Sequence, residues 1–501
     1  MLLINGLKLD LNHNENDLKR LIEKKLKHPI NSFEIKRKSL DARKKPLYVY
    51  SVIVDIDNED KYLSKDIVKY HKENLNAEYI KRNKKCIVVG YGPAGIFAAY
   101  RLIEAGYDVS VFEKGKRIKQ RELDVDKFFK EGILDENSNV QFGEGGAGTF
   151  SDAKLTTRIK NKYIEYILDV FVKHGAKESI KYENHAHIGT DEIRIIISKI
   201  TDYLISKGCD FHFEEEIIDL DIKNNEISLI KTKKGEYQAD YYLFATGHSS
   251  HSIYSLFKQK GIYMSKKDIA LGFRVEHPQS LINQRQTNNL INEANEYLLR
   301  YKDEKGVYSF CMCPGGIVIP AMSEKNTIVT NGMSYSSRDS GVANSAILIQ
   351  VNKDEFDDGF IFLKHYEQLA YNYSNSYKAL SQNIKDFMNN ELNELIFKST
   401  YPLGTVLYNF NDLFNENDLK IIKKALLDFD SKILGFIDSG IMVGPETRSS
   451  CPIRINRNES YQSINTSNLY PIGEGAGYGG GIISCALDGI RIANAIISNY
   501  E

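Results

Sequence analysis

The sequence predicts an α/β protein in which a doubly wound parallel sheet is interrupted by an inserted α+β domain and preceded by a small α+β domain. Three observations predict this class. Residues 86–113 read as an apolar strand, a glycine-rich turn, a helix and a second strand. A buried strand ending at 247, and a strand, glycine-rich turn and helix over 469–498, continue the pattern. Strands that alternate with helices are typical of parallel βαβ units.

Length and composition set the expected organisation of the chain. Its 501 residues suffice for two or three domains, and 42% hydrophobic with 27% charged residues is ordinary for a soluble globular protein. We expect four segments: a small basic α+β domain (1–80), the first part of the parallel-sheet domain (81–262), an inserted substrate domain with an antiparallel sheet (263–440), and the C-terminal part of the parallel-sheet domain (441–501).

Composition also limits the partners and the location. The formal net charge of −1 gives no overall field suited to nucleic acid or an anionic membrane surface. No apolar run approaches the roughly 20 residues that span a bilayer, and no signal segment opens the chain. Six sparse cysteines without zinc spacing fit a reducing compartment, and His185 and His187 lack further ligands nearby. We therefore expect a cytoplasmic protein with no membrane partner and no metal.

The first 80 residues predict the small domain. Alternation at 2–9 indicates a strand, and apolar residues at helical spacing indicate a helix at 14–27. Two further strands are expected at 32–40 and 47–56. A polar helix is expected over 61–81, leading to the parallel sheet.

The segment 19–45 of this domain is strongly basic, with eleven Lys and Arg against three acidic residues. Such a balance fits a docking patch for nucleic acid or an acidic partner, or else a solvated face. No interleaved aromatic residues form a stacking platform for bases. The solvated face is therefore favoured, and nucleic-acid binding stays open as the less favoured alternative.

The turn between the first two parallel strands carries the pattern Gly90-x-Gly92-x-x-Gly95. Gly90 permits a tight turn, Gly92 lets a pyrophosphate approach the backbone, and Gly95 lets helix and strand pack closely. The following helix offers unpaired N–H groups to phosphates. Glu113 ends the second strand, where a carboxylate can accept hydrogen bonds from a ribose. The alternative is a purely structural turn, but the strand, helix and strand around it favour a dinucleotide site.

A second glycine-rich segment follows a charged helix that ends at Gly132. Glycines at 143, 145, 146 and 148 form a loop that must bend sharply or lie against something flat. An irregular structural loop would use fewer glycines. We therefore favour contact with a cofactor or a substrate.

The remaining elements complete the two larger domains. In the parallel-sheet domain we expect a helix at 192–207 and strands at 210–213, 217–222, 226–232 and 237–245. In the inserted domain we expect strands at 269–276, 316–320 and 327–330 and helices at 355–374 and 384–395. The last strand and turn (469–481) run into a mostly apolar helix at 482–498, whose N-terminus again presents bare N–H groups.

Three of these segments, in this order, resemble the FAD segments of the glutathione-reductase-type FAD fold. They are the GxGxxG turn with its distal Glu113, the Ala-Thr-Gly strand end at 245–247, and Tyr-Pro-Ile-Gly-Glu at 470–474. Further motifs are similar to those of one family in it, bacterial proteins described as FAD-dependent dehydrogenases or NAD(P)/FAD-dependent oxidoreductases. These motifs are 38–45, 141–152, 187–191, 273–278, 310–316, 331–334 and 446–450. The resemblance covers essentially the whole chain and implies a Rossmann-like FAD-binding domain over 81–262 and 441–501.

The resemblance also implies the contacts that the cofactor would make. The FAD pyrophosphate would meet Gly90, Gly92, Pro93, Ala94 and Gly95. The adenosine half would meet Glu113, Lys114, Arg121 and the backbone of Ile217. Thr246 and Gly247 would bend close to the cofactor, Gly473 and Glu474 would touch its ribityl chain and pyrophosphate, and Gly480, Gly481 and Ile482 would aim a helix N-terminus at the flavin. That dipole would favour the anionic reduced flavin.

Three residues are candidates for the chemistry itself. His277, which follows Glu276 at the end of a predicted strand, could donate a proton near neutral pH, or it could cap backbone groups. Arg448 could clamp a substrate carboxylate, or it could form an internal salt bridge. For Cys311 and Cys313, packing thiols are favoured over a redox pair, because the spacing is not CxxC and such a disulfide would be strained.

Together these observations predict an FAD-dependent oxidoreductase. It would pass a hydride between FAD and an unidentified small organic substrate or NAD(P)H. No second GxGxxG occurs in the chain, so NAD(P)H would dock only transiently. The alternatives are a flavin-dependent monooxygenase, and an FAD-containing RNA- or partner-binding protein that uses the basic segment.

Overall fold

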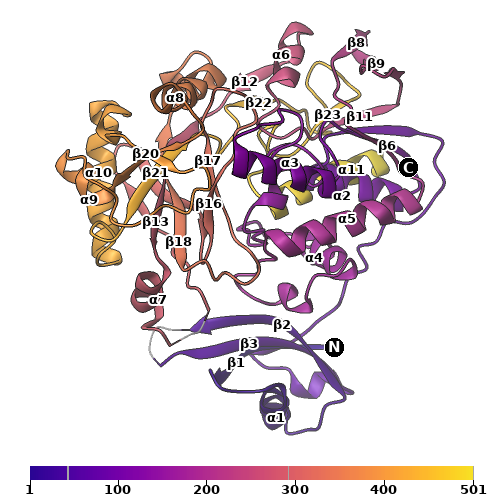
Figure 1. Ribbon diagram of the computed structural model, residues 1–501. Helices are drawn as coiled ribbons and strands as arrows, with labels where there is room; N and C mark the ends of the chain where they lie inside the picture. The colour runs from indigo at the N-terminus through magenta and orange to yellow at the C-terminus, as the bar shows by residue number, and fades with distance from the viewer. Residues whose placement is uncertain (42–44, 291–292, 500–501) are drawn as a thin grey trace. The chain divides into compact units, whose positions relative to one another are not determined.

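The structure is a computed structural model that describes residues 1–41, 45–290 and 293–499 (Figure 1). The predicted α/β class is confirmed. The chain divides into two compact units: Met1–Asn76 with Lys154–Ile188 (unit 1), and Ala77–Ala153 with Gly189–Glu501 (unit 2). Among the described residues, none of the helices combines the length and the apolar character needed to cross a membrane.

Unit 1 is built on a four-stranded antiparallel sheet in the order β2-β3-β1-β4. Its strands are β1 (Leu2–Asp10), β2 (Ser32–Asp41), β3 (Leu47–Asp55) and β4 (Ile67–Lys69). Helix α1 (Glu15–Leu26) begins at Asn14, whose side chain accepts the N–H of Asp17 while Asp17 accepts the N–H of Asn14, a capping box. The apolar stripe of α1 packs into one core with the buried side of the sheet.

The segment 154–188 belongs to unit 1, whereas the sequence prediction placed it in the first part of the FAD-binding domain. It carries α4 (Tyr163–Lys173), whose Glu165 lies 2.6 Å from Lys36 Nζ. The backbone N–H of Lys38 donates to Tyr182 O at 2.7 Å. These contacts join residues more than 100 positions apart, which local patterns along the sequence cannot reveal.

The polar helix predicted over 61–81 is wrong. The structure has a short 3-10 turn (Glu59–Tyr62), then β4, and no regular helix or strand from 70 to 84, all of which are described residues. Ile67 of this segment is buried in the core of unit 1 and pairs with β1 as part of β4, because tertiary contacts override a weak local preference for helix.

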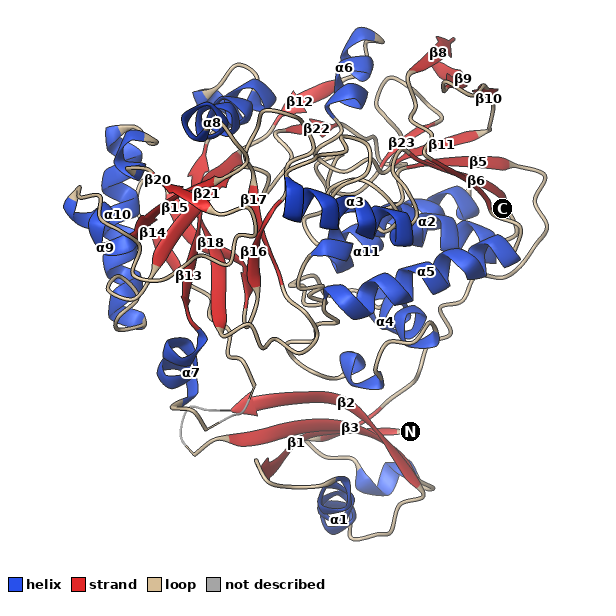
Figure 2. Cartoon of the chain, in the orientation of Figure 1, coloured by secondary structure: helices blue, strands red, loops and turns tan. Residues whose placement is uncertain are grey.

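One large sheet of unit 2 has five parallel strands in the order β23-β11-β5-β6-β7. Its strands are β5 (Lys85–Val89), β6 (Asp108–Glu113), β7 (Asp210–Phe213), β11 (Tyr241–Phe244) and β23 (Leu469–Pro471). Figure 2 shows helices α2 (Pro93–Glu104), α5 (Thr190–Ser206) and α11 (Ile482–Ser498) on one side of this sheet. The antiparallel meander of β8 (Asp219–Lys223), β9 (Glu226–Lys231) and β10 (Glu236–Tyr237) lies on the other.

The other large sheet of unit 2 has seven strands in the order β14-β15-β18-β13-β21-β19-β20. Its strands are β13 (Ile269–Pro278), β14 (Arg300–Lys302), β15 (Gly306–Cys313), β18 (Val342–Val351), β19 (Ala379–Asn383), β20 (Thr405–Leu407) and β21 (Ile441–Glu446). All pairs are antiparallel except β19 with β20. The central strand β13 is buried from Ile269 to His277, because both of its faces are covered.

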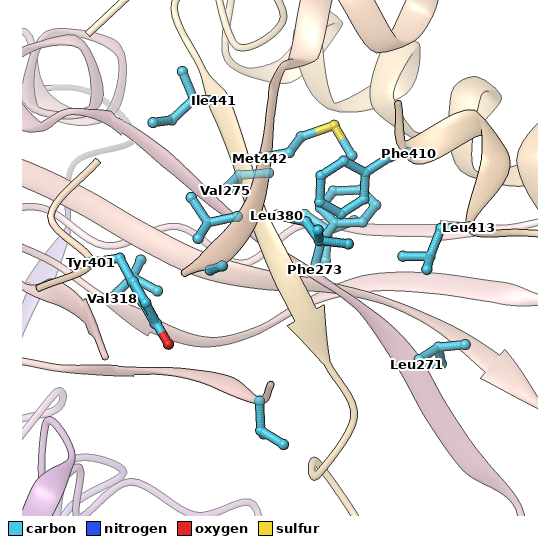
Figure 3. Packing of buried hydrophobic residues seen from close by; sticks show 14 of the residues in the cluster. Leu271, Phe273, Val275, Val318, Leu380, Tyr401, Phe410, Leu413, Ile441 and Met442 are labelled. Atoms are coloured by element: carbon cyan, nitrogen blue, oxygen red, sulfur yellow. The ribbon is translucent and has the colours of Figure 1, made fainter. Parts of the chain in front are cut away.

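The core of this sheet is aromatic and aliphatic. Phe273 of β13 packs edge-on against Phe410, with ring centroids 5.6 Å apart, and Leu380 and Met442 lie beside them (Figure 3). Helices α8 (Gly359–Ser374), α9 (Ile384–Asn389) and α10 (Glu416–Lys432) contribute to the same core. The strand β13 is therefore packed on both faces, and near its start Ser449 Oγ donates to Ala270 O.

Candidate functional site

The turn after β5 has the close packing that its glycines predict. Gly90 has φ +93°, and a methyl group there would lie 2.5 Å from the carbonyl oxygen of Ala245. A methyl group on Gly95 would collide with the carbonyl oxygen of Gly90. Helix α2 begins after Gly92 with Pro93 at its first position, where the missing N–H costs nothing. The first-turn N–H groups therefore remain for a phosphate.

Glu113 ends β6 and lies at the centre of this turn. Its carboxylate accepts the backbone N–H groups of Tyr91 at 3.0 Å, Gly115 at 2.9 Å and Gly143 at 3.0 Å. A carboxylate has about four lone-pair sites, so about one remains for a ribose hydroxyl. Glu113 thus both fixes the turn and keeps an acceptor for the predicted adenosine contact.

The segment with Ile217 lies beside the end of β6. The N–H groups of Glu214 and Glu215 donate to the carbonyl oxygens of Gly115 and Glu113, each at 3.1 Å. Ile217 is buried and comes two residues before β8, which begins at Asp219 and not at 217 as predicted. Lys114 Nζ lies 3.7 Å from Glu216 and 4.1 Å from the centre of the Phe142 ring. Lys114 and Ile217 therefore lie near Glu113, where the resemblance expects adenine.

Arg121 does not fit its predicted contact with adenine or a phosphate. It is fully buried on α3 (Ile118–Glu131), and its guanidinium donates to acceptors around the loop 143–148. These acceptors are the carbonyl oxygens of Asn139 (2.8 Å), Val140 (3.0 Å), Glu144 (2.7 Å) and Gly146 (2.9 Å) and the hydroxyl of Thr149 (2.8 Å). Because all five N–H groups are used, Arg121 shapes the loop and has none left for the cofactor.

The loop 143–148 lies flat against the starts of two helices. A methyl group on Gly146 would lie 2.9 Å from Gly92 Cα, and one on Gly148 would lie 3.3 Å from Ile482 Cγ1. The N–H of Gly145 donates to Tyr91 O at 2.9 Å. The loop therefore joins the GxGxxG turn to the start of α11, and its glycines are needed for close packing.

The C-terminal segment meets the same turn. A methyl group on Gly473 would lie 2.8 Å from Ala94 Cβ, and one on Gly475 would lie 2.6 Å from the carbonyl oxygen of Gly247. By contrast, Gly247 and Gly480 have no other atom within 4 Å of such a methyl group. Gly481 has only Ser484 Oγ, at 3.9 Å. The predicted cofactor segments thus converge, and the protein leaves space beside Gly247 and at the N-terminus of α11.

Asp488 supports this segment and was not assigned a role from the sequence. Its carboxylate accepts the N–H of Gly473 at 2.8 Å and pairs with Arg457 at 3.0 Å. It is buried in a mostly apolar helix. An acidic residue in such a helix was the signal that could have indicated this role, because a buried charge needs partners.

His248 is a second residue that the sequence reading missed, although it directly follows Gly247. Its Nδ1 lies 3.6 Å from Glu474 Oε1, and its buried Nε2 has no hydrogen-bond partner among the described residues. Burial, and then the positive charge of Arg448, lowers the pKa of His248 to about 3. Burial raises the pKa of Glu474 to about 7. A neutral imidazole thus lies beside a carboxyl group that titrates near neutrality.

The structure does not bring Glu276 and His277 to this site. Ser449 Oγ donates to Ala270 O at 3.1 Å, so the Ala270 end of β13 lies beside residues 447–449. Six residues at about 3.3 Å each put Glu276 roughly 20 Å further along the strand. Glu276 accepts hydrogen bonds from Thr400, and His277 Nε2 donates to Phe436 O at 2.7 Å. These contacts favour the alternative of a histidine bonded to backbone for His277, and the catalytic role of the two residues stays a prediction.

Arg448 forms the internal salt bridge that was the alternative to a substrate clamp. Its Nε and Nη2 lie 3.1 and 2.9 Å from the carboxylate of Glu367. Its Nη1 lies 2.6 Å from Ser323 Oγ and 3.3 Å from Ser249 Oγ. Although burial acts to lower it, the pKa of Arg448 is raised by Glu367. Arg448 joins Ser249, which directly follows His248, to Glu367 of α8. Its guanidinium is therefore not available to bind a substrate carboxylate.

Arg274, to which the sequence gave no role, lies in a polar group on β13 and its neighbour β21. Arg274 of β13 is fully buried, with Nε 2.7 Å from Glu446 Oε2 and Nη1 2.5 Å from Asn344 Oδ1. Its Nη2 donates to Cys311 O at 3.0 Å. Burial alone would lower the pKa of Arg274, but Glu446 raises it, so the guanidinium stays charged. We call Arg274, Glu446, Asn344, Cys311 and Cys313 the Arg274 cluster.

Known proteins share sequence features with most of this chain. Residues 84–281 match the family model described as pyridine nucleotide-disulphide oxidoreductase, and residues 268–449 match "FAD-dependent protein, C-terminal domain-like". Residues 1–57 match a domain of unknown function, DUF8436. An uncharacterized protein of Clostridium beijerinckii (strain ATCC 51743 / NCIMB 8052) is 39% identical over 531 residues, covering 99% of each chain.

Solved structures share little sequence with this chain. L-proline dehydrogenase from P. horikoshii is 11% identical with a TM-score of 0.37, over 84% of this chain and 95% of that one. Halogenase PltM is 10% identical with a TM-score of 0.40, over 83% of this chain and 71% of that one. Since both scores lie below 0.5, no conclusion rests on them. On its relative and its two flavoprotein models, this chain belongs to the family of bacterial FAD-dependent oxidoreductases that its motifs resemble, and FAD is its cofactor.

Proposed function

We propose that this oxidoreductase passes a hydride between bound FAD and a small organic molecule, and that NAD(P)H is one such molecule. The observation that carries the proposal is the open space around Gly247, Gly480 and Gly481, at the N-terminus of α11. FAD supplies the two-electron chemistry when it is bound. A helix N-terminus stabilises nearby negative charge by about 0.3–2 kcal/mol, which favours the reduced cofactor.

Glu474 and His248 are the proposed proton-holding pair. Burial raises the pKa of the Glu474 carboxyl to about 7, and a group with such a pKa gives and takes protons readily at neutral pH. His248 lies 3.6 Å away and is neutral, because burial lowers its pKa to about 3. His248 directly follows Gly247, and the Glu474 side chain is 28% exposed. We therefore assign to this pair the role that the sequence gave to Glu276 and His277.

Anaerobic mixing of the FAD-loaded protein with NADH or NADPH tests the proposal. We expect one of them to bleach the flavin absorbance at pH 7. We expect Glu474→Gln to slow this bleaching at least about 10-fold at equal FAD content, since general acid–base catalysis contributes roughly 10²–10⁴-fold. Glu131→Gln, which changes an exposed carboxylate, is the matched control and should not alter the rate.

If neither nucleotide bleaches the flavin, the nicotinamide version fails, and small amino and hydroxy acids are then tested as donors. Oxygen uptake with a hydroxylated product would instead indicate a monooxygenase. No feature of the described residues favours that reaction over simple hydride transfer.

For partners, the proposal includes only a small molecule, and for location it includes the cytoplasm. Nucleic-acid binding through 19–45 stays a prediction outside it, because several cations of the segment pair inside unit 1: Lys36 with Glu165, Lys45 with Asp10 and Arg20 with Asp17. Residues 42–44 of that segment lie outside the described residues. Salt-sensitive tRNA binding that is lost on deleting residues 1–80 would restore this function. All six cysteines are described and none is in a disulfide, which supports a cytoplasmic location.

A further inference from the structure

Tyr254 lies where two of the predicted cofactor segments meet, and the sequence gave it no role. It is buried on α6 (His251–Gln259), and its hydroxyl oxygen lies 2.7 Å from Gly247 O and 3.0 Å from Gly475 O. Gly247 belongs to the turn after β11, and Gly475 belongs to the C-terminal segment after β23. One side chain therefore contacts both segments.

The two carbonyl oxygens need a second donor besides Tyr254. A tyrosine hydroxyl carries a single proton, so Tyr254 cannot fully satisfy Gly247 O and Gly475 O together. The thiol of Cys451 lies 3.4 Å from Gly475 O and 3.6 Å from the Tyr254 hydroxyl oxygen, and it supplies this donor. Burial raises the pKa of Tyr254 and of Cys451, so both groups keep their protons at neutral pH.

The backbones of Gly247 and Gly475 are in direct contact at this point. A methyl group on Gly475 would lie 2.6 Å from Gly247 O and 2.8 Å from the Tyr254 hydroxyl oxygen. The Tyr254 ring stacks on Phe360 of α8, with ring centroids 4.9 Å apart and ring planes 20° apart. The packing of α6 on α8 therefore sets the position of the hydroxyl.

The separation of the two segments determines what lies next to each glycine. His248 directly follows Gly247, and Glu474 directly precedes Gly475. The Nδ1 atom of His248 lies 3.6 Å from Glu474 Oε1. A methyl group added to Gly247 would have no other atom of the described residues within 4 Å. A movement of one segment against the other would therefore change the space beside Gly247.

We propose that Tyr254, assisted by Cys451, is a positioning group for FAD, which holds the segments at Gly247 and Gly475 at the separation that the cofactor needs before it binds. A site that is already arranged for its ligand loses less free energy on binding. Without the hydroxyl, two buried carbonyl oxygens share one weak thiol donor. The binding-competent arrangement is then less populated, and the apparent Kd for FAD rises by the same factor. This inference rests on FAD as the cofactor and not on the hydride donor proposed above.

The substitution Tyr254→Phe in the full-length protein tests the role, because it removes only the hydroxyl and keeps the ring on Phe360. We expect it to raise the Kd for FAD about 10-fold, measured by fluorescence titration. Tyr107→Phe is the matched control, because Tyr107 is also buried and its hydroxyl donates to Ile496 O at 3.1 Å. Ile496 lies roughly 21 Å along α11 from its start. Tyr107→Phe should therefore lower the urea midpoint by a similar amount and leave the Kd for FAD unchanged.

A second pair of variants does not depend on the folding of Tyr254→Phe. Cys451→Ala removes the second donor, and we expect it to raise the Kd for FAD about 3-fold, because a thiol is a weak donor. Cys451→Ser supplies a hydroxyl donor again, and its Kd should lie closer to that of the wild type. Because an unpaired buried hydroxyl is costly, this recovery would report the hydrogen bond and not the packing.

Two results would overturn the inference. One is a folded Tyr254→Phe whose Kd for FAD equals that of Tyr107→Phe. The other, which decides the question if Tyr254→Phe does not fold, is an equal Kd in Cys451→Ala and Cys451→Ser. All of these measurements use FAD alone, so failure of NADH and NADPH to bleach the flavin tests the proposed function separately.

Discussion

At the scale of single residues, the glycines of the cofactor site have two different roles. Gly90, Gly95 and Gly475 are crowded by neighbouring backbone, so a side chain there would push structural elements apart. Gly247 and Gly480 face open space, so a side chain there would not meet the protein, and we expect it to meet the cofactor instead. The sequence shows the same residue type at all five positions.

A pair of substitutions separates these roles. Gly95→Ala is expected to lower the free energy of unfolding of the apoprotein by about 1–3 kcal/mol, because the new methyl group collides with Gly90 O. Gly480→Ala should leave that free energy within about 0.5 kcal/mol of the wild type and raise the Kd for FAD about 10-fold or more. Urea unfolding and fluorescence titration with FAD measure the two effects. Unchanged FAD affinity in Gly480→Ala would show that this glycine does not face the cofactor.

His277 makes stability depend on pH. Burial lowers its folded-state pKa from 6.5 to about 4, so between these values the unfolded chain binds a proton that the folded protein refuses. The neutral, buried His277 therefore contributes in full to the free energy of unfolding above pH 6.5. This contribution, at most about 3 kcal/mol, is lost as the pH falls toward 4. His277→Gln should flatten the fall of unfolding free energy between pH 6.5 and 4.5, measured by urea unfolding. The same change at exposed His365 is the control, and a slope equal to the wild type in His277→Gln would contradict the assignment.

At the scale of elements, the site depends on a loop held by a helix. The loop 143–148 reaches the starts of α2 and α11 only because Arg121 of α3 binds four of its surrounding carbonyl oxygens. An arginine can do this because its planar guanidinium offers five N–H groups, whereas a lysine offers three at a single point. We therefore expect Arg121 to act on the cofactor through the loop and not by contact.

Replacing Arg121 tests this role. Arg121→Met leaves buried carbonyl groups without donors, at about 1–3 kcal/mol for such a group, so we expect at least about 3 kcal/mol less unfolding free energy and loss of FAD. Arg121→Lys should recover only part of both. Lys127→Met, at an exposed position of the same helix, should change neither. Bound FAD and unchanged stability in Arg121→Met would show that the loop does not need this side chain.

At the scale of the whole molecule, the chain has two compact units, and every predicted FAD segment lies in unit 2. Unit 1 has its own core, formed by α1 and its four-stranded sheet, and gains the segment 154–188 from the middle of the chain. Binding energy from FAD should therefore stabilise one unit more than the other.

Hydrogen exchange with and without FAD measures this difference. At a free FAD concentration of 100 times Kd, binding stabilises the folded state by about 2.7 kcal/mol. We expect the slowing of exchange to be concentrated in β5, β11 and β23, with β1, β2 and β3 changing little. Equal slowing in both sets of strands would show that the two units unfold together.

The sequence by itself determined the cofactor and most of the elements around it. The GxGxxG turn, the acid that ends the next strand and the strand before the last helix are local features, and they require only a certain residue at a certain spacing. The last helix, expected at 482–498, has those bounds in the structure. Local backbone chemistry suffices for these features because the phosphate-binding groups belong to the backbone itself.

Only the tertiary structure decided which distant side chains meet within unit 2. Arg274 finds Glu446 across a strand pair 172 positions apart in sequence, and Arg448 finds Glu367 on a helix 81 positions away. The bulge at Cys311 arises from pairing with β18, and the burial of His277 arises from the layers on both faces of β13. Strand register and layer packing set these contacts, and both depend on partners that are distant along the chain.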